Sequence, residues 1–139
     1  MGVLSTELNV DAVLGTEGII KEEITDFQSR QSQLEMSRLI DDGISKGQSH
    51  LIEASTGIGK SFAYLVPVFL SKKKVVISTG TKNLQDQLFY KDIPLIKRII
   101  VNSKKTALLK GRSNYCCPHR IDLFRHQKQF RSREMAALF

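Results

Sequence analysis

The stretch Ala54-Ser55-Thr56-Gly57-Ile58-Gly59-Lys60-Ser61 decides the fold that this sequence predicts. A short apolar strand is expected just before it, over residues 50–53, and a largely apolar helix just after it, over residues 61–70. This strand-loop-helix order is typical of a phosphate-binding loop. Gly57 and Gly59 let the backbone curl so that successive N–H groups point at a phosphate near the positive end of the helix. The sequence therefore predicts a nucleotide site, with ATP as the ligand.

Lys60 and Ser61 are the predicted catalytic residues of this loop. Lys60 is expected to reach the β- and γ-phosphates, and the Ser61 hydroxyl to ligate the Mg²⁺ that bridges them. A glycine-rich turn that merely joins a strand to a helix is the structural alternative, and the complete Gly-x-Gly-Lys-Ser run argues against it. The nucleotide-binding residues predicted from the loop are Ala54, Ser55, Thr56, Gly57, Ile58, Gly59, Lys60 and Ser61.

The segments around the loop predict an α/β domain. Residues 1–29 have mixed polarity and indicate an irregular lead-in, whereas apolar residues at spacings of three to five predict an amphipathic helix over residues 30–46 that ends at Gly47. Apolar runs at 74–78 and 106–109 predict two further strands, with helices between them that begin near Thr79 or Thr81 and at about residue 93. Strands that alternate with helices predict a parallel sheet with the loop at its carboxyl edge.

Composition limits the classes of protein that this chain can represent. The chain has 139 residues, which suits one domain or part of one, and its net charge is +7. Nine basic residues and two acids lie from Asn102 onward, so that segment carries the whole excess. A basic end suits a nucleic-acid backbone, and a solvated tail is an equally good explanation. No apolar run reaches 18 residues and no secretory signal is evident, which predicts a cytoplasmic protein without a membrane span.

Acidic residues after the loop are isolated from one another. Nucleotide hydrolysis at such loops usually needs adjacent acids at the end of a later strand, which hold Mg²⁺ and orient water. None of the acids downstream of Ser61 forms such a pair. We therefore expect the isolated chain to be inactive as an ATP hydrolase.

The motifs of this chain together resemble the DinG/YoaA branch of the XPD-like DNA helicases, within helicase superfamily two, from about residue 13 to about residue 120. Arg30-x-x-Gln33-x-x-Met36 resembles the family signature in which the glutamine reads adenine. A carboxamide can donate to N7 and accept from the exocyclic amine at once. The loop resembles the helicase form, in which alanine or glycine opens the run, so Ala54 fits. The resemblance adds Arg30 and Gln33 to the predicted nucleotide-binding residues.

Residues 77–88 are similar to the family's motif Ia, which grips the sugar-phosphate backbone of a single strand. Hydroxyls, backbone N–H groups and a lysine suit a phosphate contact that ignores sequence. For any one of these residues, helix capping is the structural alternative. The resemblance implies single-stranded DNA and DNA junctions or duplex as partners, contacted by Thr79, Thr81, Lys82 and Asn83.

The run Lys110-Gly111-Arg112-Ser113-Asn114-Tyr115-Cys116-Cys117 resembles a family segment that ends in the first of four cysteines around an iron–sulfur cluster. In that register Cys117 is the metal ligand and Cys116 is a small buried hydrophobe. A [4Fe–4S] cluster needs four thiolates, and the chain has two cysteines. The cluster is therefore expected only in the complete enzyme.

The resemblance implies a domain order and a function. Residues 30–110 would be the amino-terminal part of a RecA-like ATP-binding domain, and residues 111–139 the start of a truncated iron–sulfur domain. We expect the ATP-binding part of an ATP-dependent DNA repair helicase of 5′-to-3′ polarity. One alternative is a truncated, non-catalytic module that binds nucleotide or nucleic acid, and another is a different phosphate-loop enzyme such as a small kinase.

Overall fold

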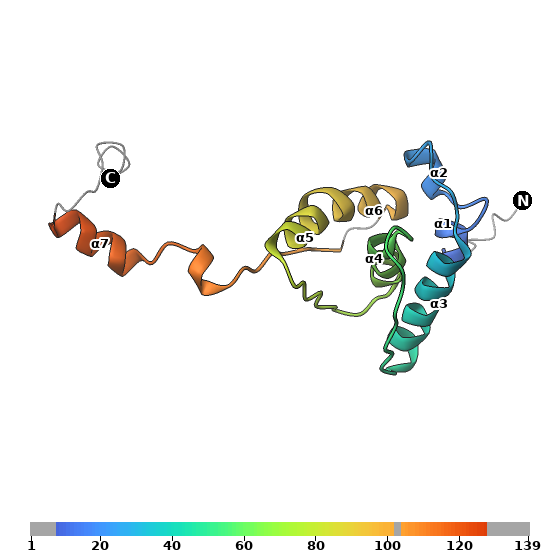
Figure 1. Ribbon diagram of the computed structural model, residues 1–139, viewed down its shortest axis with the longest axis horizontal. Helices are drawn as coiled ribbons and strands as arrows, with labels where there is room; N and C mark the ends of the chain where they lie inside the picture. Colours follow the sequence, from blue (N-terminus) through green and yellow to red (C-terminus); the bar gives the residue numbers. More distant parts are fainter. Residues whose placement is uncertain (1–7, 102–103, 128–139) are drawn as a thin grey trace, which may run out of the picture. The chain divides into compact units, whose positions relative to one another are not determined.

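The computed structural model describes residues 8–101 and 104–127 (Figure 1). The chain divides into two compact units, Met1–Thr106 and Ala107–Phe139. The last basic residues of the predicted carboxyl-terminal patch, from Lys128 on, lie outside the described residues. Within the described part of the chain, every helix is too short or too polar to traverse a bilayer.

Helices make up the regular structure of both units. The second unit has a short 3₁₀ turn η2 (Arg112–Asn114) and α7 (Pro118–Gln127). The helices predicted over residues 30–46 and 61–70 and from residue 93 are confirmed. The first unit contains α1 (Val10–Leu14), α2 (Ile20–Glu23), α3 (Gln31–Lys46), α4 (Lys60–Leu70), α5 (Lys82–Gln87), the π-helix η1 (Leu88–Asp92) and α6 (Ile93–Ile100).

The predicted end of one helix and the predicted start of another are confirmed by the hydrogen bonds of their cap residues. Gly47 ends α3 with φ 70°, and its N–H donates to the Gly43 carbonyl. Only glycine adopts this left-handed conformation without a steric cost, which explains why the helix stops there. Thr81 begins α5, and its side-chain oxygen accepts a hydrogen bond from the Leu84 N–H at 3.2 Å.

The predicted α/β fold with a parallel sheet is wrong for this structure, since residues 8–101 and 104–127 contain helices and no strand. Segments 50–53, 74–78 and 106–109 are irregular, and Leu51 and Val76 are 104% and 89% exposed. β-branched residues suit a pleated surface, but a strand is stable only when a neighbour pairs with its backbone and covers its side chains. Among the residues that the structure describes, no segment pairs with any of these three, so their apolar composition did not produce a sheet.

The core of the first unit is built around α4. This helix packs against α3 on one side and α6 on the other, and α1 contacts both α3 and α4 (Figure 1). Burial of apolar surface between α4 and these three helices is the main contribution to the stability of the first unit. The buried apolar side chains come from five helices and the π-helix: Val10, Val13, Leu14, Ile20, Leu34, Leu65, Val66, Val68, Phe69, Leu88, Ile96 and Ile99.

Helices α3 and α4 run side by side in the same direction. At their amino-terminal ends, the Gln33 side chain of α3 reaches Gly59, the residue before α4. At their carboxyl-terminal ends, the Lys73 ammonium, just beyond α4, donates to the Ile44 and Ser45 carbonyls of α3. Both helices therefore direct the positive ends of their dipoles toward the loop.

Candidate nucleotide-binding site

The loop between residues 54 and 61 has the backbone conformation that its glycines predict. Gly57 and Gly59 have φ values of 81° and 83°, in the left-handed region that side chains disfavour. Gly59 is the N-cap of α4, and no side chain caps this helix. The first N–H groups of an α-helix have no intrahelical acceptor. In α4 these donors stand at the loop, where an anion would be stabilised.

Lys60 folds back over the loop that precedes it. Its ammonium donates to the carbonyl oxygens of Ala54 at 2.8 Å and Ser55 at 2.9 Å, and the residue remains exposed. A Cβ placed on Gly57 would meet no atom within 4 Å, so open space adjoins the loop. A positive charge, helix N–H groups and open space are the features that a phosphate group requires, and the loop residues fit a nucleotide phosphate.

Two side chains of the Arg30-x-x-Gln33 signature hold the loop from α3. Gln33 is 3% exposed, and its Nε2 donates to the Gly59 carbonyl at 2.9 Å. Arg30 donates from Nη1 to the Gly57 carbonyl. A Cβ on Gly59 would lie 2.2 Å from Gln33 Nε2, so the contact itself requires glycine there. The sequence predicted that these residues bind nucleotide, and the structure adds that they fix the loop backbone.

Ser61, the predicted Mg²⁺ ligand, lies in the first turn of α4 beside Tyr64. Burial raises the pKa of the Tyr64 phenol, and the hydrogen bond to the Ser61 side chain partly opposes that shift. The nearby Asp92 carboxylate raises the same pKa further. Tyr64 therefore keeps its proton at neutral pH.

The predicted DNA contacts lie around the start of α5, where their hydrogen bonds are local. The Thr79 hydroxyl donates to the Thr81 carbonyl at 3.2 Å, and the Thr81 side chain caps α5. Lys82 and Asn83 are exposed in the first turn. Local hydrogen bonds thus account for Thr79 and Thr81, whereas no side-chain hydrogen bond within the described residues explains why Lys82 and Asn83 occur here.

Known proteins resemble the chain across both the loop and these flanking segments. Residues 30–115 match the DEAD/DEAH box helicase family, more than half of the chain. The chain belongs to the DEAD/DEAH box helicase family. It is 46% identical over 116 residues to the ATP-dependent DNA helicase YoaA of Haemophilus influenzae, covering 84% of this chain and 18% of the relative. No solved structure shows a significant match.

Several further relatives carry the name DinG. The ATP-dependent DNA helicase DinG of Escherichia coli K12 is 38% identical over 108 residues, covering 73% of this chain and 15% of that protein. The 3'-5' exonuclease DinG of Bacillus subtilis is 35% identical over 118 residues, covering 82% of this chain and 13% of that protein. This helicase-family chain therefore spans less than a fifth of the length of these curated relatives.

The predicted iron–sulfur segment of this helicase-family chain is exposed. The prediction that Cys116 is buried is wrong, because both Cys116 and Cys117 are exposed free thiols. The Lys110 N–H donates to the Tyr115 hydroxyl at 2.8 Å and orders the turn before them. Among the residues that the structure describes, no three cysteine, histidine or acidic side chains gather as a metal site. Cys116 and Cys117 alone therefore cannot supply the four thiolates of such a cluster.

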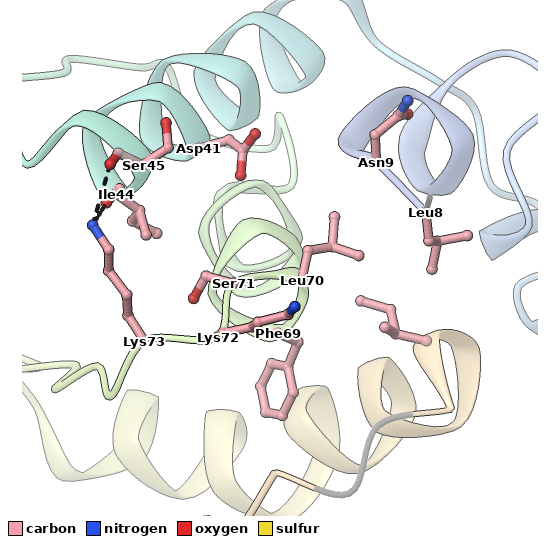
Figure 2. A pocket seen from close by; sticks show the side chains of 11 residues that line it. Leu8, Asn9, Asp41, Ile44, Ser45, Phe69, Leu70, Ser71, Lys72 and Lys73 are labelled. Atoms are coloured by element: carbon pink, nitrogen blue, oxygen red, sulfur yellow. Dashed lines mark hydrogen bonds between the residues drawn. The ribbon is translucent and has the colours of Figure 1, made fainter. Parts of the chain in front are cut away.

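A separate cavity lies at the other end of α4. It measures about 740 Å³ and is surrounded by Leu8, Asp41, Phe69 and Leu70, among others (Figure 2). The eleven residues of α4 separate it from the loop by roughly 15 Å, at about 1.5 Å per residue. The cavity is therefore not the phosphate site, which lies at the loop before α4.

The sequence did not predict the role of Lys104, which stabilises the far end of the helix that begins at the loop. The Lys104 ammonium donates to the carbonyls of Val68 at 2.7 Å, Ser71 at 2.7 Å and Lys73 at 3.1 Å, and lies 6.0 Å from the centre of the Phe69 ring. It thus caps the carboxyl-terminal end of the helix that begins at the loop. No local pattern relates a lysine to carbonyls more than thirty positions earlier.

Proposed function

We propose that this chain is the ATP-binding part of an ATP-dependent DNA helicase. The observation that carries the proposal is the loop before α4, with Gly57 and Gly59 at positive φ and Lys60 folded over it. Membership of the DEAD/DEAH box helicase family and the resemblance to proteins named DNA helicases support the same assignment. Unwinding of DNA is proposed for the complete protein, because the chain spans less than a fifth of those relatives.

Each residue of the loop has a proposed task toward Mg–ATP. Lys60 leaves the Ala54 and Ser55 carbonyls and neutralises the β- and γ-phosphates, while N–H groups of the first α4 turn donate to phosphate oxygens. The Ser61 hydroxyl is the proposed Mg²⁺ ligand. Bound Mg–ATP supplies the phosphoanhydride bond whose hydrolysis drives a helicase.

Gln33 is proposed to read the adenine base in addition to holding the loop. Its Nε2 is engaged by the Gly59 carbonyl and its side chain is buried, so reading adenine requires this carboxamide to turn toward the base. Arg30 remains the support of the Gly57 carbonyl. Selection of adenine would thus be coupled to the loop backbone through one side chain.

Single-stranded DNA is the proposed macromolecular partner. Thr79, Thr81, Lys82 and Asn83 offer hydroxyl, amide and ammonium groups at an exposed helix start, which suits phosphate oxygens. For the complete protein we propose 5′-to-3′ unwinding of duplexes and junctions in the cytoplasm during DNA repair. Cys117 is a proposed cluster ligand there, with three thiolates from outside this chain.

The isolated chain is proposed to bind nucleotide without hydrolysing it. Asp86 lies in α5 and Asp92 in the adjoining π-helix, so these two acids are not the adjacent acidic pair that hydrolysis at such loops usually needs. Steady ATP turnover by the purified 139-residue chain would contradict this part of the proposal.

The helicase assignment is tested by Lys60→Ala in the complete protein, with DNA-stimulated ATP hydrolysis as the measurement. We expect activity to be lost, because no other cation contacts the loop carbonyls of Ala54 and Ser55 among the described residues. Lys46→Ala is the matched control, since this exposed α3 lysine pairs with Asp42. Retained turnover in Lys60→Ala would contradict the assignment.

A further inference from the structure

An exposed aromatic ring continues the surface that begins at the proposed DNA contacts. Residues 82–100 are helical without a break, through α5, η1 and α6. Tyr90 lies in the π-helical part and is 64% exposed. π-helical turns within helices occur frequently at functional sites. This ring has no part in the core and no role in the nucleotide site.

Tyr90 is one of several exposed residues along this helical segment. Asn83 and Gln87 are four positions apart and share a face of α5, and exposed residues continue through the π-helical turn to the start of α6. This stripe of exposed residues begins in the first turn of α5, where the proposed phosphate contacts lie, and continues past the π-helix. Its exposed members are Asn83, Gln87, Tyr90, Lys91 and Pro94.

The exposed charge along this segment is positive. Lys82 and Lys91 are exposed, whereas Asp86 and Asp92 are only partly accessible. The Asp92 carboxylate is engaged by the Gln87 side chain, which donates a hydrogen bond to it at 3.1 Å. An anionic partner therefore meets lysines without meeting fully exposed carboxylates.

The Tyr90 ring is held in place from its own helix. Phe89, which is half-buried, packs against it edge to face, with ring centres 5.1 Å apart and planes at 89°. Such a pair stabilises the ring orientation. A supported, exposed aromatic ring beside lysines is the arrangement on which bases of single-stranded nucleic acids stack.

We propose that Tyr90 is a base-stacking residue for single-stranded DNA, and that the stripe from Asn83 to Pro94 extends the contact surface of Thr79, Thr81, Lys82 and Asn83. This inference rests on the proposed function, because it requires the strand to reach the start of α5. Tyr90 adds what those phosphate contacts lack, an interaction with the bases themselves. Any base can stack, so the contact is independent of sequence.

The test compares an oligothymidylate with an abasic strand of equal length, using fluorescence anisotropy on the 139-residue chain. We expect the wild type to bind the base-containing strand more tightly, and Tyr90→Ala to weaken that binding at least about fivefold while binding of the abasic strand stays unchanged. Tyr90→Phe keeps a ring and should retain the preference. Leu39→Ala, which truncates an exposed side chain of α3, is the control.

A direct reporter is available because the chain has no tryptophan. Tyr90→Trp introduces a single indole, and stacking predicts that its fluorescence is quenched by oligothymidylate and not by the abasic strand. Equal oligothymidylate binding by wild type and Tyr90→Ala would overturn the stacking role and leave the helicase proposal standing. Failure of the wild type to bind either strand, with Mg–ATP binding intact, would overturn both the stacking role and the proposed DNA contacts.

Discussion

Gln33 donates a hydrogen bond from Nε2 to the carbonyl oxygen of Gly59 over 2.9 Å, and this bond joins the first turn of α3 to the residue that begins α4. The same Nε2 atom would lie 2.2 Å from a Cβ on Gly59. The pair therefore couples the position of an α3 side chain to the backbone of the phosphate loop. A substitution at either residue should therefore change the stability effect of a substitution at the other.

Alanine at the two loop glycines should have unequal effects on stability. Both glycines have positive φ, so alanine at either should cost about 1–2 kcal/mol in backbone strain. Gly57→Ala meets open space, whereas Gly59→Ala also displaces the Gln33 carboxamide and breaks its hydrogen bond, adding about 1 kcal/mol. Urea denaturation measures the difference.

The double variant Gln33→Ala with Gly59→Ala separates these two costs. Removing the Gln33 carboxamide should eliminate the additional cost of Gly59→Ala, so that the substitution costs about as much as Gly57→Ala does. Strict additivity of the Gln33 and Gly59 substitutions would contradict the coupling that the 2.2 Å approach implies.

Gln33→Ala should also change nucleotide selectivity. Loss of the loop contact weakens binding of every nucleotide, whereas loss of adenine reading weakens ATP alone. We therefore expect affinity for Mg–ATP to fall more than affinity for Mg–GTP, measured by titration calorimetry of the 139-residue chain. Equal decreases for both nucleotides would show that Gln33 serves only the loop.

Lys104→Met should destabilise the first unit. The ammonium of Lys104 donates to three carbonyls at the end of α4, and loss of these donors should cost about 1–2 kcal/mol. The exposed neighbour Lys105 provides the control, since Lys105→Met removes the same charge. The free energy of unfolding in urea is the measurement, and an equal loss in both variants would contradict the capping role.

The pair Asp11 and Arg38 should give the chain a small acid sensitivity. The hydrogen bond from the Arg38 guanidinium holds the pKa of Asp11 below its usual range, so the folded state favours the carboxylate. The resulting stability is present above about pH 4, the ordinary range of an aspartate, and is lost as pH falls through the lowered pKa. The effect is small because both side chains are about half exposed, 51% for Asp11 and 48% for Arg38.

Asp11→Asn is the variant that tests this pair. Below about pH 4, we expect its thermal midpoint to fall less steeply with decreasing pH than that of the wild type. The exposed Asp26 supplies the control, and Asp26→Asn should follow the wild type. Identical acid profiles for wild type and Asp11→Asn would show that the pair adds no pH-dependent stability.

Helix ends and the conformation of the loop could be predicted from the sequence because they depend on the properties of single residues. The helix end at Gly47, the cap at Thr81 and the two loop glycines each depend on the backbone freedom or side-chain oxygen of one residue. Helicase family membership was likewise predicted from the motifs around Gln33 and Lys60, and residues 30–115 match the DEAD/DEAH box helicase family.

Other features could not be predicted because they depend on partners distant in sequence. The apolar run that includes Val76 suits a strand, yet whether it pairs is decided by segments elsewhere, and here it stays exposed. Lys104 caps a helix that ends 34 residues earlier, without any local signal. The hydrogen bond from Gln33 to the Gly59 carbonyl was not predicted either, because the two residues are distant in sequence and the Arg30-x-x-Gln33 motif suggested only a contact with the base.

The decisive measurement is a titration of the 139-residue chain with Mg–ATP, for the wild type and for Lys60→Ala. We expect one site per chain, and affinity about 10- to 100-fold weaker in Lys60→Ala, because a charge-assisted contact to phosphate is lost. Lys46→Ala should bind as the wild type does. Absence of binding by the wild type, or equal affinity in Lys60→Ala, would contradict the assignment of this loop as the ATP site.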